Sequence, residues 1–201
     1  MAQRIVFFDL ETGGLDARHP DIQIAAVATE GLVEVDVFEA KIQFDARAAD
    51  PEALKINSYD AKLWQKEAQP ERVVVAGFAT FLNKHATLER TAKGSGRPYQ
   101  VARLAGHNVL GFDAPRLNTL FKRHGVFLPA DTFRPLDTLQ LAYWSAAKLG
   151  LEPSNFKLAT LCETFAISAE GAHDALADVR MCVALARALL ERLGSTGSAR
   201  G

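Results

Sequence analysis

Two carboxylates with the spacing of a metal site end a short apolar run near the start of the chain. Asp9 and Glu11 follow the apolar residues 5–8, and two glycines come shortly afterwards. Side chains alternate along a strand, so this pair would project to one face, about 6.6 Å apart at roughly 3.3 Å per residue. Buried like charges raise each other's pKa unless a cation lies between them, and carboxylates suit Mg²⁺ or Mn²⁺. An edge strand that ends in two solvated acids is the alternative interpretation.

Such a site could be joined by three further residues from later parts of the chain. Asp113 follows a second apolar run, 99–105, and is either a ligand or the N-cap of the next helix. Asp178 falls in the first turns of the last predicted helix, which Asp174 caps, and the positive end of a helix favours a carboxylate there. His173 precedes that helix in a loop, and histidine is the residue type suited to accept a proton near neutral pH.

Composition is that of an ordinary globular chain. The 201 residues are 48% hydrophobic and 23% charged, which suits one domain with a full core. Lys and Arg number 23 against 24 Asp and Glu, so binding of a polyanion requires a local basic face or metal ions in an acidic site. Cys162 and Cys182 lie in apolar helical sequence without zinc spacing, which predicts buried thiols. Because no secretory leader or membrane-spanning run is present, we expect a cytoplasmic protein.

The order of strand and helix patterns predicts an α/β fold. Three strand-like segments near the start, two of them joined by a turn at Glu30-Gly31, predict an antiparallel meander. Helical spacing begins at Pro51, and Asp60 and Asp137 have the positions of helix N-caps. The predicted strands span residues 4–10, 22–29, 32–44, 99–105 and 133–136. The predicted helices begin at 51 and span 61–68, 71–92, 115–124, 138–148, 157–165 and 174–193. Residues 1–193 are expected to form one domain, and 194–201 a disordered tail.

Three stretches together resemble the DEDDh family of 3′-to-5′ exonucleases. They are F-D-L-E-T-G-G-L at 8–15, H-N-V-L-G-F-D at 107–113 and H-D-A-L-A-D at 173–178. This family includes the proofreading subunit of bacterial replicative polymerase, exonuclease I, ribonuclease T and oligoribonuclease. The resemblance implies a ribonuclease H-like fold, with a mixed five-stranded sheet and helices on both sides.

The resemblance also implies a catalytic set and two cofactor ions. Two Mg²⁺ or Mn²⁺ ions would neutralise charge on the phosphoryl oxygens and lower the pKa of bound water. His173 would act as the general base. The implied metal-binding acids are Asp9, Glu11, Asp113 and Asp178.

Four further positions match the family's substrate contacts. Thr12 lies where the family contacts the terminal 3′ hydroxyl, and Leu15 where an apolar side chain wedges against the terminal bases. His107 and Asn108 fall in the stretch that lines the nucleotide pocket. From the residues alone, Leu15 is equally compatible with a core position, and Asn108 with a turn.

The resulting hypothesis is a metal-dependent 3′-to-5′ exonuclease that releases nucleoside 5′-monophosphates, with single-stranded DNA as the expected substrate. The alternatives are an exoribonuclease or oligoribonuclease, a non-catalytic nucleic-acid-binding or polymerase-associated module, and a phosphoesterase for a small nucleotide. Expected partners are a nucleic acid 3′ end and either a DNA polymerase or a second copy of the chain, without a membrane. Gln23, where the family often carries an acid, and the longer spacer before Asp113 leave the subfamily open.

Overall fold

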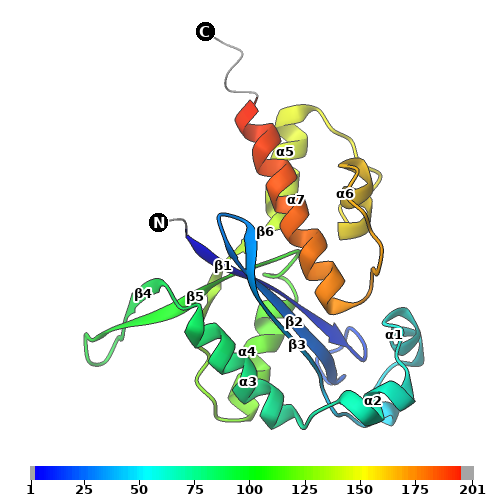
Figure 1. Cartoon of the computed structure of the whole chain (residues 1–201), viewed down its shortest axis with the longest axis vertical. Coiled ribbons are helices and arrows are strands. Elements are labelled where there is room, and N and C mark those ends of the chain that lie inside the picture. The colour runs from blue at the N-terminus through cyan, green and yellow to red at the C-terminus, as the bar shows by residue number, and fades with distance from the viewer. Residues whose placement is uncertain (1–2, 196–201) are drawn as a thin grey trace.

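The centre of the fold is strand β1, Arg4–Thr12, which has neighbours on both sides in a six-stranded mixed sheet. The computed structural model describes residues 3–195, and Figure 1 shows helices against both faces of the sheet. The strand order is β3-β2-β1-β5-β4, and β6 also pairs with β5. The other strands are β2 (Asp21–Glu30), β3 (Val33–Lys41), β4 (Leu88–Thr91), β5 (Pro98–Gly106) and β6 (Ala130–Asp137).

Strand pairing confirms that the sheet is mixed. Strands β1, β2 and β3 form the expected antiparallel meander, whereas β5 runs parallel to both β1 and β6. The sheet has six strands instead of five because the first half of β5 pairs with β4. This extra hairpin extends away from the body of the molecule in Figure 1.

Helices complete the two outer layers. Helices α3 and α4 cover one face of the sheet, and α7 crosses the other face (Figure 1). In the described range 3–195, no helix is both long and apolar enough to cross a membrane. The helices are η1 (Ala46–Ala48), α1 (Pro51–Ile56), α2 (Ala61–Glu67), α3 (Glu71–Lys84), α4 (Asp113–Arg123), α5 (Thr138–Leu149), α6 (Leu158–Thr164) and α7 (Ala175–Ser195).

The two faces of β1 contact different layers. Phe8 and Leu10 pack in the core with α3 and α4, whereas Phe7 packs against α7. Because alternate residues share a face, Asp9 and Glu11 follow Phe7 on the α7 side. The strand therefore has a continuous apolar face and a second face that changes from apolar to acidic.

The predicted helix over 71–92 is wrong beyond Lys84. Helix α3 ends there, and Leu88–Thr91 forms strand β4, which pairs antiparallel with β5 from Pro98 to Val101. The apolar spacing that identified the helix stops at Leu82, so the remaining residues had no helical face to bury.

Several helix caps and both cysteines are as the sequence predicts, whereas the end of the last helix differs. Asp60, Asp137 and Asp174 accept backbone hydrogen bonds from the first turns of their helices. Both cysteines are buried free thiols. Helix α7 includes Gly194 and Ser195, and the predicted tail from 196 onwards lies outside the described residues.

The end of β5 approaches β1 very closely. A Cβ atom on Gly106 would lie 3.0 Å from the Phe8 carbonyl oxygen and 2.9 Å from the Val109 Cβ, so glycine is needed here. The loop that follows is held by the Asp137 carboxylate, which accepts hydrogen bonds from the backbone N–H groups of Asn108 and Leu110. Asp137 therefore fixes this loop as well as capping α5.

We predict that Asp137→Ala destabilises the fold more than an ordinary cap substitution. Three backbone N–H groups lose their acceptor, so we expect a loss of about 2 kcal/mol or more in the free energy of unfolding. Asp60→Ala removes a cap with a single such bond and should cost about 1 kcal/mol. Urea unfolding of both variants measures the difference, and equal losses would show that Asp137 is only a cap.

Candidate metal centre and cleft

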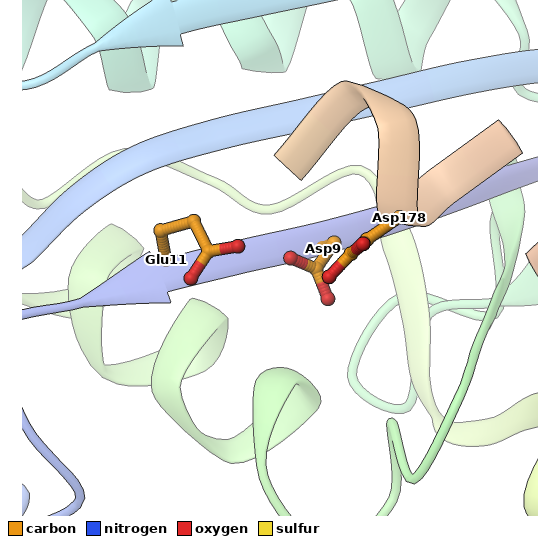
Figure 2. A group of neighbouring side chains, drawn as sticks. All are labelled: Asp9, Glu11 and Asp178. Carbon is orange, nitrogen blue, oxygen red and sulfur yellow. The ribbon is translucent and has the colours of Figure 1, made fainter. Parts of the chain in front are cut away.

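Three carboxylates from two elements meet on the α7 side of the sheet. One oxygen atom from each of Asp9, Glu11 and Asp178 lies within 4.8 Å of the others. Figure 2 shows the Asp9 and Asp178 side chains meeting, with Glu11 farther along β1. The strand period places the first two on one face, and α7 supplies the third from its first turn.

The surroundings of these acids disfavour their charged forms. Burial is the main cause that raises the pKa of Asp9, and the neighbouring carboxylates raise it further. Burial, followed by Asp178 and Asp113, raises the pKa of Glu11 to about 7. The pKa of Asp178 is raised as well, again chiefly by burial. Within the described range, no lysine or arginine forms an ion pair with Asp9, Glu11 or Asp178.

Asp113 reaches the same cleft from α4. It is the first residue of the helix rather than its N-cap, and its carboxylate accepts a hydrogen bond of 3.2 Å from the Leu10 N–H. The pairing of β1 with β5 ends at Phe7. Asp113 therefore bonds β1 beyond the point where β5 stops pairing with it. Burial raises the Asp113 pKa to about 7. Its carboxylate is not part of the group within 4.8 Å.

His173 lines the same cleft from the loop before α7. The loop backbone there has a φ of +70°, a region that non-glycine residues rarely adopt. Its N–H donates a hydrogen bond of 3.3 Å to Asp178 Oδ1. The loop conformation therefore depends on a contact with one of the three clustered acids.

A cleft of about 530 Å³ brings together eight of the nine residues that the sequence predicts for the site. Thr12 is the exception: it is buried, and its hydroxyl donates a hydrogen bond of 3.0 Å to the Gly14 carbonyl oxygen instead. The predicted residues that line the cleft are Asp9, Glu11, Leu15, His107, Asn108, Asp113, His173 and Asp178.

Leu15, Asn108 and His107 have distinct positions in the cleft. Leu15 is 87% exposed, which excludes the core alternative. Asn108 is a turn residue with a φ of +58°, and it also lines the cleft. The His107 ring contacts the Thr138 hydroxyl at 3.0 Å, and its Nε2 donates to the Phe156 carbonyl oxygen at 2.9 Å. Both ring nitrogens of His107 are thus engaged within the protein, and this ring holds the cleft wall in place.

Sequence reasoning missed an aromatic wall of the same cleft. Tyr143 and Phe156 pack with their ring centroids 4.3 Å apart, and Lys157 extends the same wall. Tyr143 is 46% exposed, so part of its ring is available to a bound molecule. These residues come from α5 and from the loop before α6, and only the folded chain brings them into one cleft with the acids of β1.

The donor set fits a hard divalent cation. Mg²⁺ and Mn²⁺ prefer carboxylate oxygens, and one such ion would relieve the repulsion among Asp9, Glu11 and Asp178. The three could hold an ion together, and Asp113 lies in the same cleft. A cation of this kind compensates the burial of their charges.

Comparison with protein families gives one match, to the exonuclease family RNase_T over residues 99–186. The matched region contains Asp113, His173 and Asp178, whereas Asp9 and Glu11 precede it. None of the curated proteins matches the chain.

Solved structures of exonuclease I share the fold. The E. coli enzyme in a zinc-bound complex with single-stranded DNA has a TM-score of 0.76 at 19% identity, covering 96% of this chain and 42% of that protein. Exonuclease I from Methylocaldum szegediense also has a TM-score of 0.76, at 22% identity, with 96% and 41% covered. The chain thus spans less than half the length of these proteins, and the likeness establishes the ribonuclease H-like fold.

We predict that the metal-free protein loses stability as the pH rises from about 5 to 8. Glu11 and Asp113 have folded-state pKa values of about 7, above those of the unfolded chain, so unfolding releases protons in this window. Each released proton lowers the free energy of unfolding by up to about 1.4 kcal/mol per pH unit. Thermal unfolding in chelator at several pH values measures this slope, and Mn²⁺ should remove most of it.

A matched pair of variants tests the cause of that slope. Asp9→Asn removes one of the repelling charges and should stabilise the metal-free protein at pH 8. Asp60→Asn, on the exposed cap of α2, should leave the slope unchanged. Metal-free unfolding temperatures that stay constant between pH 5 and 8 would contradict the electrostatic account.

Proposed function

We propose that this chain is a metal-dependent 3′-to-5′ exonuclease, as the DEDDh resemblance implies. The match to the exonuclease family over residues 99–186 and the fold shared with exonuclease I support the proposal. It removes nucleoside 5′-monophosphates one at a time, preferably from single-stranded DNA. The proposed exonuclease domain is residues 1–193. One observation carries the proposal: four acids and a histidine line one open cleft, and three of the acids lie within 4.8 Å of one another.

The proposed roles follow from position. Asp9, Glu11 and Asp178 would hold divalent metal, with Asp113 contributing from the α4 side. Two metal ions, when bound there, would lower the pKa of a water molecule and neutralise charge at the phosphoryl oxygens. His173 accepts the proton of the attacking water. The hydrogen bond from its backbone N–H to Asp178 keeps the loop that carries His173 beside the acids.

The bond that breaks joins the terminal phosphate to the preceding nucleotide. Water adds to phosphorus, and the 3′ oxygen of the preceding nucleotide leaves in line with the attack and takes up a proton from solvent. The products are a nucleoside 5′-monophosphate and a strand shortened by one nucleotide with a free 3′ hydroxyl. This strand can then enter the same cleft for the next cycle.

The rest of the cleft suits a terminal nucleotide. Exposed Leu15 and the aromatic pair of Tyr143 and Phe156 offer apolar surfaces for a base, and bases stack on aromatic side chains. Lys157 gives the same wall a cation for a phosphate. The complex of E. coli exonuclease I with single-stranded DNA supports the choice of polymer.

An end-labelled single-stranded DNA tests the reaction and its direction. With Mg²⁺ or Mn²⁺, a 5′-labelled strand should give a ladder of progressively shorter products, and a 3′-labelled strand should release labelled mononucleotide first. A chelator should abolish both the product ladder and the release of mononucleotide. Faster digestion of RNA would favour the exoribonuclease alternative, and tight binding without turnover under either metal would favour a binding module.

Substitution of the site residues separates metal binding from proton transfer. We predict that Asp9→Asn and Asp178→Asn lower kcat by at least about 100-fold, because each removes a carboxylate from the metal group. His173→Asn should lower kcat by about 10²- to 10⁴-fold, the usual range for a general base, without weakening Mn²⁺ binding. Asp60→Asn serves as the control. Full activity in both Asp9→Asn and His173→Asn would contradict the assignment.

A further inference from the structure

A buried amide lies between two carboxylates at the edge of the proposed centre. Gln23 is 2% exposed, and its Nε2 donates hydrogen bonds to Glu39 Oε1 at 3.1 Å and to Asp174 Oδ2 at 3.3 Å. An amide nitrogen has two protons, so these two bonds use its full donor capacity. The side chain thus connects β2 to β3 and to the start of α7.

Gln23 is directly opposite one of the proposed ligands. In the β1–β2 register it pairs with Glu11, and both side chains project towards α7. Its neighbours on this face of β2, Ala25 and Val27, pack against the apolar part of α7. The apolar contacts fix the body of the helix, and the polar contact of Gln23 is made at its first turn.

Asp174 transmits this contact to the site. Its other oxygen, Oδ1, accepts a hydrogen bond from the Ala177 N–H, and its carbonyl accepts one from the Asp178 N–H. It is also adjacent to His173 in sequence. Both the α7 ligand and the proposed base are therefore attached to a residue that Gln23 holds.

We propose that Gln23 is a positioning residue that fixes the first turn of α7 against β1, and with it the separation between Asp178 and the acids of β1. This inference rests on the proposed metal site. Gln23 does not touch the reacting groups and acts through Asp174. Leucine at this position would leave Asp174 Oδ2 without its donor, and glutamate would face two carboxylates with no proton to donate.

The first test measures Mn²⁺ affinity directly, by calorimetric titration of the chain without substrate. We expect Gln23→Leu to weaken Mn²⁺ binding by about 10-fold or more, the usual effect of losing a residue that orients a metal ligand. In single-stranded DNA hydrolysis, kcat at limiting Mn²⁺ should fall while KM for DNA stays within about twofold.

Thr29→Val is the matched control, because Thr29 is fully buried in the same strand and its hydroxyl bonds to the Ile5 carbonyl oxygen, away from the cleft. It should lower stability to a similar extent without changing Mn²⁺ affinity. Equal Mn²⁺ affinity in Gln23→Leu and Thr29→Val would overturn the proposal and leave Gln23 with a structural role only.

A charge-conserving exchange gives a second test in case Gln23→Leu does not fold. Gln23→Glu and Asp174→Asn should each weaken Mn²⁺ binding, because the first removes the donor and the second removes the acceptor. The double variant Q23E/D174N restores the hydrogen bond between positions 23 and 174 in the opposite direction. Of the two carboxylates that bond Gln23, only Glu39 then faces the new one. Asparagine at position 174 also caps a helix well. We expect the double variant to bind Mn²⁺ more tightly than either single variant, and additive losses would overturn the proposal.

These outcomes are distinguishable from failure of the proposed function. If the wild-type chain binds Mn²⁺ but hydrolyses no nucleic acid, the exonuclease proposal fails, and the Mn²⁺ affinities of the variants still decide the role of Gln23. If the wild-type chain binds no Mn²⁺, both proposals fail.

Discussion

Repulsion among partly buried carboxylates is the constraint on which the structure depends. Asp9, Glu11 and Asp178 converge within 4.8 Å, and burial together with their mutual charge raises their pKa values. A sequence selected only for stability would replace such a group with apolar residues, because even oppositely charged buried pairs seldom improve stability and like charges repel. The rest of the fold must therefore provide the stability that this cleft costs, and a bound cation gives the carboxylates a favourable partner.

The fold meets this constraint with rigid elements on both sides of β1. Phe8 and Leu10 anchor the strand in the core with α3 and α4, and Phe7 anchors it against α7. Beyond Phe7 the pairing of β1 with β5 ends, and the Leu10 N–H bonds Asp113 instead. The same separation of strands opens the cleft and brings a fourth acid to it. The acids that face the cleft are thus held in place by the apolar packing of the strand that carries them.

The sequence predicted features that depend on local order along the chain. Asp9 and Glu11 share a face because strand side chains alternate. Asp60 and Asp174 are caps because their side chains accept hydrogen bonds from backbone N–H groups only three residues ahead. The hairpin between β2 and β3 follows from its turn in the same way. The spacing of the three motifs then indicated the family, although spacing alone could not give the distances between the acids.

Features created by tertiary contact were not predictable in this way. Strand β4 exists because β5 lies beside it, and its four residues have no strand signal strong enough to end the predicted helix. Tyr143 and Phe156 form a cleft wall only after α5 and the loop before α6 come together. Gln23 was noted only as a departure from the family pattern, and its bonds to Glu39 and Asp174 require three elements to be in place.

Crystals grown at pH 8 with saturating Mn²⁺ test the central claim most directly, because anomalous diffraction locates the ion without any assay. The account predicts an anomalous peak at about 2.0 to 2.3 Å from carboxylate oxygens of Asp9 and Asp178. Glu11 should bind the same ion directly or through water. A cleft without Mn²⁺ under these conditions, with the three carboxylates paired to lysine or arginine side chains instead, would contradict it.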